Sequence, residues 1–157
     1  MPKQNVLYLA CSWFSPEEKQ HLQQAQQQLA QNPTVDWDNS FRPLEHQFGD
    51  YDVSHNPAAL ADPLWQMGTF RNDLTGIDKA DLVCGLFVPE KPDTGMAFEF
   101  GYAYACHKPI FAVIPDNSTV PINVMLVPSV TQYIRLSDAA TFDFNNYDFD
   151  LFSVSTF

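Results

Sequence analysis

The fold is decided by the stretch ADLVCGLFVPEKPDTGMAFEFGYAYAC, residues 80–106. Residues 80–88 form a nearly unbroken apolar run, which is typical of a central strand buried on both faces of a sheet. A loop with two prolines follows, and residues 93–106 then have the length and composition of a helix. Strand, short loop and helix in succession are the building unit of α/β proteins, so we expect a parallel sheet covered by helices.

The helix predicted over 93–106 carries a single ionisable side chain within its apolar body, that of Glu99. A surface helix has a polar face and this one has almost none, so we expect it to be buried nearly all round, against its own sheet and another subunit. Asp93 or Thr94 is the expected N-cap, which places Glu99 near the positive end of the helix dipole. An ionised carboxylate in a dry site has the properties of a nucleophile. The alternative is a glutamate that meets solvent or a lysine.

Apolar runs and capping residues predict the remaining elements. Further strands are expected at three apolar runs, residues 6–11, 109–114 and 130–136, with a weaker signal between 34 and 43. Helices are expected after N-cap and proline signals, at residues 16–31, 57–74 and, as a short piece, 121–125. Strands that are apolar on both faces and alternate with helices indicate an α/β fold: a single-domain, flavodoxin-like doubly wound parallel sheet of about five strands, over residues 1–157.

Two segments fit neither strand nor helix. Residues 44–56 are polar and irregular, and a loop of that length in a compact domain is usually functional or a lid. Residues 142–157 alternate aromatic side chains with Asp and Asn. This tail cannot build a core by itself, so we expect it to pack across its own subunit or a neighbour.

The charge and the cysteines narrow the function classes. The formal net charge of -11, from 19 acidic and 8 basic residues, argues against nucleic acid and membrane surfaces as partners. It leaves uncharged nucleosides open and disfavours phosphorylated ligands, because few cationic side chains could hold them. Cys11, Cys84 and Cys106 have no metal-binding spacing, so we expect reduced thiols in a cytoplasmic protein. No apolar run has the length of a signal sequence or a membrane span.

In a doubly wound sheet, ligands bind at the carboxyl ends of the strands. The polar and aromatic side chains expected there are Tyr8, Trp13, Phe14, Gln47, Asp73, Asp93, Glu99 and Asn123. Three carboxylates, aromatic rings and two amides suit a neutral, polyhydroxylated ligand that carries a flat ring. The chain has neither of the glycine-rich loops that bind nucleotide phosphates.

A carboxylate nucleophile with a second carboxyl group as proton donor is the arrangement for glycosyl transfer with retention. Each candidate also has a structural alternative. Asp73 could cap a helix or pair with Arg71 or Lys79. Asp93 could serve only as a helix N-cap, and Asn123 could be a turn residue.

Four segments resemble nucleoside 2-deoxyribosyltransferases, most closely the type II enzymes of lactobacilli, which accept purines and pyrimidines. They are YLACSWF (8–14), FRNDLTGI (70–77), DTGMAFEFGYA (93–103) and PINVM (121–125). The resemblance covers essentially the whole chain, in order and with closely matching spacing. It implies transfer of 2-deoxyribose between purine and pyrimidine bases of 2'-deoxyribonucleosides, with these nucleosides and free bases as partners and no metal or organic cofactor.

By this resemblance, Glu99 takes the place of the catalytic nucleophile, which attacks the anomeric carbon and forms a covalent deoxyribosyl-enzyme. Tyr8 matches the tyrosine that hydrogen-bonds and orients that nucleophile. Asp73 matches a family carboxylate at the base, and Asp93 one near the sugar and leaving group. One of these two should protonate the departing base, and the motif does not decide which.

The resemblance also assigns substrate-binding residues. Trp13 and Phe14 match the family's Trp-Phe pair, and Gln47 matches a residue of the base-binding loop. Asn123 and Met125 match residues supplied by a neighbouring subunit, with Asn123 directed to a sugar hydroxyl. The family is oligomeric, commonly a hexamer built as a trimer of dimers.

Two departures from the family pattern concern the site. The family's first turn is usually rich in glycine, and here it is Ala10-Cys11-Ser12. The family's chain often ends in a tyrosine near the nucleophile, whereas this one has Phe157. Two rival functions are a hydrolase of the same fold that cleaves the N-glycosidic bond, and a non-catalytic nucleoside-binding module.

Overall fold

Four parallel strands form the sheet of the computed structural model, which describes residues 2–149 and 154–157. They lie side by side in chain order: β1 (Leu7–Cys11), β2 (Leu82–Leu86), β3 (Ile110–Ile114) and β4 (Gln132–Arg135). Every residue of β2 and β3 is buried, because a helix covers each face of the sheet. This two-sided burial explains why both strands read as unbroken apolar runs.

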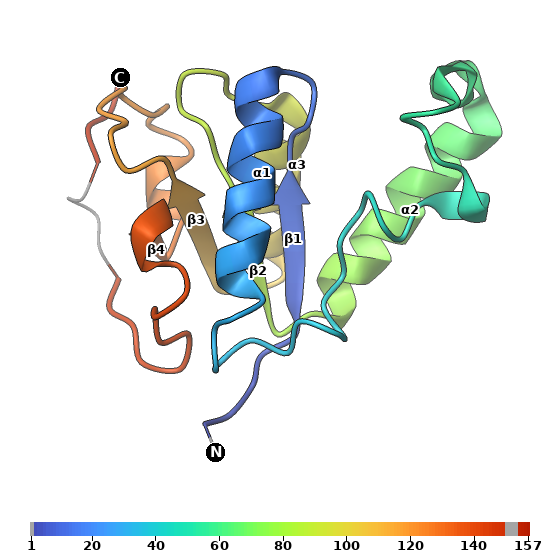
Figure 1. Cartoon of the computed structure of the whole chain (residues 1–157). Helices are drawn as coiled ribbons and strands as arrows, with labels where there is room; N and C mark the ends of the chain where they lie inside the picture. Colours follow the sequence, from blue (N-terminus) through green and yellow to red (C-terminus); the bar gives the residue numbers. More distant parts are fainter. Residues whose placement is uncertain (1, 150–153) are drawn as a thin grey trace.

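Helices cover both faces of the sheet. α1 (Pro16–Leu29) lies on one face and α3 (Thr94–Ala105) on the other, while α2 (Pro63–Lys79) runs past β1 and extends away from the sheet (Figure 1). Four short 3-10 helices complete the described elements: η1 (Phe48–Asp50), η2 (Pro57–Ala61), η3 (Val127–Ser129) and η4 (Leu136–Asp138). The predicted α/β fold with a parallel, doubly wound sheet is confirmed.

The weak strand signal between 34 and 43 corresponds to two isolated parallel bridges on the free edge of β1, one of them between Tyr8 and Phe41. Phe41 N donates to Leu7 O at 2.8 Å, and Leu9 N donates to Phe41 O at 2.9 Å. This segment therefore occupies the place of a fifth strand without forming a regular one. From β1 the chain goes first to this edge segment on one side and then to β2 on the other side, so the strand order reverses at β1. Doubly wound sheets bind ligands at such a point.

α1 begins at the predicted capping box. Ser15 Oγ accepts from Glu18 N at 3.2 Å, and Ser15 N donates to Glu18 Oε2 at 2.7 Å. These reciprocal bonds satisfy two donors that the first turn of a helix leaves free.

α2 begins later than predicted. Asp62 is its N-cap and accepts from Leu64 N at 2.9 Å, whereas Asn56 makes no side-chain cap bond. Residues 57–61 form the 3-10 helix η2 instead. The prediction of one helix over 57–74 is wrong because two cap-and-proline signals lie close together, and only the second one starts an α-helix.

The segment 121–125, predicted to be helical, is paired with the end of the chain instead. Ile122 N donates to Ser155 O at 2.9 Å, and Phe157 N donates to Ile122 O at 3.2 Å. A turn follows, and the helical geometry comes only at η3. The predicted helix is therefore wrong, because partners some 30 residues further along the chain take up these backbone groups.

The described part of the tail packs on its own chain. The rings of Phe142, Phe144 and Tyr147 surround Phe111 of β3, with centroids 5.5, 5.1 and 4.9 Å from that of Phe111. Residues 150–153 of the predicted tail lie outside the described residues.

α3 is packed on one side only within this chain. Met96, Phe100 and Ala103 are buried against the sheet, but Phe98 is 52% exposed and Tyr104 is 62% exposed. The predicted burial against its own sheet is confirmed on this side, and the predicted burial of the opposite side by another subunit stays a prediction, because a single chain does not test it. None of the helices in the described ranges is long and apolar enough to cross a membrane. Cys11, Cys84 and Cys106 are unpaired.

Candidate active site

Tyr8 of β1 and Glu99 of α3 form the centre of the candidate site. The Tyr8 hydroxyl donates to Glu99 Oε1 at 2.6 Å, which is a short, charge-assisted hydrogen bond when the carboxyl group is ionised. Tyr8 is fully buried and Glu99 is half-buried. The hydrogen bond that the sequence resemblance implied is therefore present, and it fixes one of the two carboxylate oxygens.

Close packing of α3 on β2 holds Glu99 in place. A β-carbon at Gly85 of β2 would lie 2.2 Å from Phe100 Cζ and 3.3 Å from Met96 Sδ, so the helix can approach only because residue 85 is glycine. At the start of the helix, Asp93 accepts from the backbone N–H groups of Gly95 and Met96 at 3.1 and 3.3 Å. The cap and the glycine contact together set where the second turn of α3 lies.

The surroundings of Glu99 favour its neutral form. The pKa of Glu99 is raised to about 7: burial is the largest cause, the negative charges of Asp73 and Asp93 act in the same direction, and the hydrogen bond from Tyr8 acts against them. Burial, with a contribution from Glu99, raises the pKa of Tyr8 far above its usual value, so Tyr8 stays a hydrogen-bond donor. At neutral pH the carboxyl group of Glu99 is thus close to the midpoint of its titration.

Asp73 and Asp93 occupy different environments. Asp73 projects from α2, is half-buried, and burial raises its pKa to about 6. Neither Arg71 nor Lys79 forms an ion pair with it in the described part of the chain. Asp93 is the N-cap of α3, as one of the structural alternatives proposed. Asp73 is therefore the carboxyl group more open to holding a proton.

β1 ends in the thiol of Cys11, and the turn after it carries two aromatic rings. The pKa of Cys11 is raised to about 12, by burial first and by the charges of Glu99 and Asp73 next, so the thiol stays protonated. The rings of Trp13 and Phe14 stack with centroids 4.8 Å apart. Phe14 is 68% exposed, whereas Trp13 packs against a small separate core of Val53, Ala59 and Trp65.

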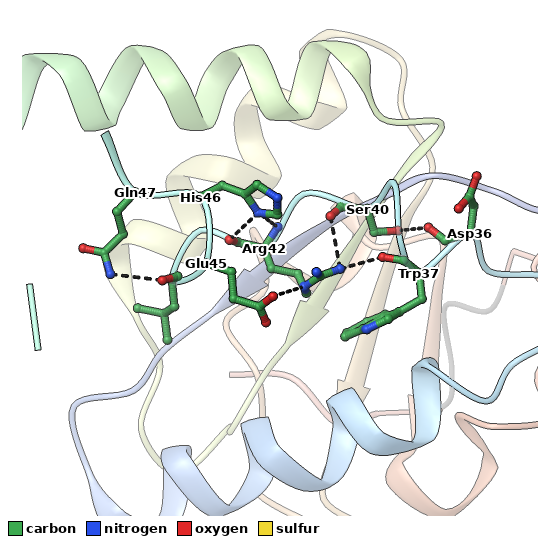
Figure 2. A network of polar contacts seen from close by, with 8 residues as sticks. Asp36, Trp37, Ser40, Arg42, Glu45, His46 and Gln47 are labelled. Carbon is green, nitrogen blue, oxygen red and sulfur yellow. Dashed lines mark hydrogen bonds and ion pairs between the residues drawn. The ribbon is translucent and has the colours of Figure 1, made fainter. Parts of the chain in front are cut away.

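The loop that carries Gln47 is held by a polar network. Arg42 donates to the backbone oxygens of Trp37 and Ser40, pairs with Glu45 at 2.8 Å and lies over the Trp37 ring (Figure 2). Because one guanidinium group joins residues on both sides of it, the segment 36–47 has a defined path along β1.

Gln47 itself uses both ends of its amide within the loop. Its Nε2 donates to Leu44 O at 3.1 Å, and its Oε1 accepts from Val53 N at 2.9 Å (Figure 2 shows the first of these bonds). The side chain that was expected to bind a substrate base is thus engaged with backbone groups six or fewer residues away. No cluster of three or more metal-ligating side chains occurs among the residues that the structure describes.

Asn123 and Met125 are exposed and lie in the segment paired with the end of the chain. Asn123 Oδ1 accepts from Met125 N at 2.8 Å, which closes a turn, and Met125 is 78% exposed. Within the described ranges, neither residue has a hydrogen bond to Tyr8, Asp73 or Glu99. Phe157, beside them, is 71% exposed.

Comparison of the whole chain with known proteins identifies its family. The family model described as "Nucleoside 2-deoxyribosyltransferase" matches residues 7–151. The chain belongs to the nucleoside 2-deoxyribosyltransferase family. The family resemblance inferred from the four sequence segments is thereby confirmed, and this family member is an enzyme of the transferase class.

Individual relatives agree with this assignment. A nucleoside deoxyribosyltransferase of Lactobacillus leichmannii is 35% identical over 153 residues, covering 97% of both chains. One from Lactobacillus johnsonii is 37% identical over 134 residues, covering 85% of this chain and 90% of the relative. The solved structure of a 2-deoxyribosyltransferase from Bacillus psychrosaccharolyticus superimposes with a TM-score of 0.72 at 28% identity, covering 89% of this chain and 93% of that one. The deoxyribosyltransferase fold therefore extends over nearly the whole chain.

Sequence reasoning did not identify one neighbour of the site, Phe41. Its ring lies against Tyr8 with centroids 5.5 Å apart and an interplanar angle of 12°. Phe41 sits in a segment with a poor strand pattern, so no periodicity signal placed it beside β1.

Proposed function

We propose that the protein transfers 2-deoxyribose between the purine and pyrimidine bases of 2'-deoxyribonucleosides, through a covalent deoxyribosyl intermediate on Glu99 and with retention at the anomeric carbon. The observation that carries this proposal is the bond from the Tyr8 hydroxyl to Glu99 Oε1 at 2.6 Å. It orients a half-buried carboxylate and leaves Oε2 to attack.

The reaction proceeds in two displacements. An oxygen of Glu99 attacks C1' of the donor, the bond from C1' to the base nitrogen breaks, and the base leaves with a proton from a neighbouring carboxyl group. A nitrogen of the acceptor base then attacks C1', its proton passes to the same neighbouring carboxylate, and the bond from C1' to the Glu99 oxygen breaks. Each step inverts the anomeric carbon, so the product has the configuration of the donor.

Asp73 is the proton donor that the electrostatics favour. Its pKa of about 6 keeps a fraction of the carboxyl groups protonated near neutral pH. Both carboxyl oxygens of Asp93 accept from backbone N–H groups of α3. We therefore assign Asp73 to proton transfer, and Asp93 to fixing the helix that presents Glu99.

We further propose that the enzyme works as a homo-oligomer, a hexamer built as a trimer of dimers, in which Asn123 and Met125 complete the site of a neighbour. This proposal is supported by large apolar side chains that are exposed to solvent in the single chain. They are Leu64, Met67 and Phe70 on α2, Phe98 and Tyr104 on α3, and Met125. Three unpaired cysteines suit the reducing cytoplasm as its location.

Transfer and hydrolysis are separated by one assay. Purified protein is incubated with deoxyinosine, with and without adenine, and the products are followed by chromatography. Deoxyadenosine that forms only with adenine supports transfer. Free hypoxanthine at the same rate in both tubes would make the enzyme a hydrolase, and unchanged deoxyinosine in both would make it a binding module.

The role of Glu99 has its own test. Glu99→Ala should abolish turnover, whereas Glu17→Ala, which removes an exposed glutamate of α1, should leave it unchanged. Acid-quenched wild-type enzyme incubated with deoxyinosine alone should carry one deoxyribosyl group on the peptide containing Glu99, by mass spectrometry. Normal turnover by Glu99→Ala would remove this residue from the mechanism.

A further inference from the structure

The hydroxyl of Tyr8 reaches Glu99 only if the Tyr8 ring keeps its tilt, and the structure shows what lies against that ring. Phe41 stacks on it almost in parallel, with centroids 5.5 Å apart and an interplanar angle of 12°. Tyr8 is one of the largest fully buried side chains of the protein, so a neighbour of this size defines the space in which its ring can move.

Phe41 is itself fixed from two directions. Its backbone N–H and C=O groups pair with β1 on either side of Tyr8, at Leu7 O and Leu9 N. Gly76 of α2 also lies against the ring, because a β-carbon there would come within 2.8 Å of Phe41 Cγ. The absence of a side chain at residue 76 therefore leaves the space that the Phe41 ring fills.

The stack continues into the loop that carries Gln47. The ring of His46 lies on the other side of Phe41, with centroids 5.1 Å apart. His46 O accepts from Asn72 Nδ2 at 2.6 Å, and Asn72 precedes Asp73 on α2. The loop that carries Gln47 and helix α2 thus both contact the ring of Phe41, which in turn contacts Tyr8.

We infer that Phe41 is a positioning residue of the transfer reaction: its ring holds Tyr8 so that the Tyr8 hydroxyl stays bonded to Glu99. This inference rests on the proposed function, because it takes Glu99 as the nucleophile. Phe41 acts through Tyr8 and touches no reacting atom. A hydrogen bond to a carboxylate stabilises the ionised form, so a misplaced Tyr8 leaves fewer ionised Glu99 side chains at a given pH.

The test is Phe41→Leu, which removes the ring and keeps an apolar side chain. We expect kcat to fall about tenfold, the scale of a weakened hydrogen bond to a carboxylate, with little change in KM for the donor. We also expect the acid limb of the kcat-against-pH curve to move to higher pH, in the same direction that we expect for Tyr8→Phe. Phe142→Leu, at an equally half-buried phenylalanine on the other face of the sheet, should change neither.

A double-mutant cycle separates positioning from general damage to the fold. In the Tyr8→Phe background the hydroxyl is already absent, so adding Phe41→Leu should cost almost nothing further in kcat. A full additional tenfold loss there would overturn the inference. If Phe41→Leu does not fold, judged by circular dichroism, Gly76→Ala tests the same point, because its new β-carbon would overlap the Phe41 ring and force it to shift.

The two proposals fail in different ways. Full activity of Glu99→Ala would refute the proposed function. A slow Tyr8→Phe enzyme together with a normal Phe41→Leu enzyme and a normal pH profile would refute only the positioning role of Phe41.

Discussion

The ring of Phe100 lies directly over Gly85, so close that a β-carbon at residue 85 would stand 2.2 Å from Phe100 Cζ. Phe100 follows Glu99 on α3, so the contact sets the height of the candidate nucleophile above β2.

Gly85→Ala should therefore lower both stability and activity. Overpacking a buried site costs about 1–3 kcal/mol of unfolding free energy, and a chain of this size loses roughly 2–4 °C of Tm for each kcal/mol. Thermal unfolding by circular dichroism measures this loss, and the kcat for base exchange should fall with it. Phe100→Leu in the same chain makes room for the new methyl group and should recover part of the Tm. No recovery in the double variant would contradict the proposed contact.

The rate should depend on pH as a bell with its maximum between about 6 and about 7. Below this range Glu99 is protonated and cannot attack, so activity falls as the pH is lowered. Above it Asp73 has lost its proton and cannot assist the leaving base, so activity falls as the pH is raised. Interacting carboxyl groups titrate as a pair, so the two limbs report apparent pKa values of both. Asp73→Asn should remove the alkaline limb, and a profile unchanged in this variant would exclude Asp73 as the acid.

Glu99→Gln should stabilise the fold at alkaline pH. Because burial raises the pKa of Glu99 from 4.5 to about 7, folding stability is highest with the neutral carboxyl group and declines as the pH rises through that range. The decline amounts to up to about 3 kcal/mol, and glutamine, which carries no charge, avoids it. The Tm of the variant should exceed that of the wild type at pH 8 and match it at pH 4. An equal difference at both pH values would mean that the effect is not electrostatic.

Gln47→Ala should weaken catalysis by the same factor for every base. Its amide bonds to Leu44 O and Val53 N hold the loop, so we expect the side chain to act through the position of the loop. Losing both bonds should raise KM roughly three- to tenfold for adenine, hypoxanthine and thymine alike. Steady-state kinetics with the three acceptors measures this. A loss confined to purines or to pyrimidines would instead assign Gln47 a direct contact with the base.

Features that depend on neighbours in the sequence were predictable. The apolar runs gave the strands, and the Ser15–Glu18 capping box gave the start of α1. The carboxyl ends of the strands, together with the family resemblance, brought Tyr8 and Glu99 to one place, where the structure has them bonded.

Features that depend on residues far away in the sequence could not be predicted. The segment 121–125 is not helical because Ile122 pairs with residues near 156, and no local sequence signal predicts that pairing. The exposure of Phe98 and Tyr104 depends on which face of α3 packs on the sheet. A helix that is apolar all round has no polar face from which this could be predicted. The contact of Phe41 with Tyr8 likewise joins residues 33 positions apart on an irregular edge.

The small core of Val53, Ala59 and Trp65 shares no buried residue with the two cores that flank the sheet, and Trp13 packs against both it and the core on the α1 side. Apart from Trp13, the packing of this part of the molecule is therefore local. Segments between Gln47 and Trp65 should be exchangeable between relatives as a cassette, with the recipient sheet folding as before. Such grafting offers a route by which base preference diverges in evolution, or is redesigned in the laboratory, while the candidate catalytic carboxyl groups stay where they are.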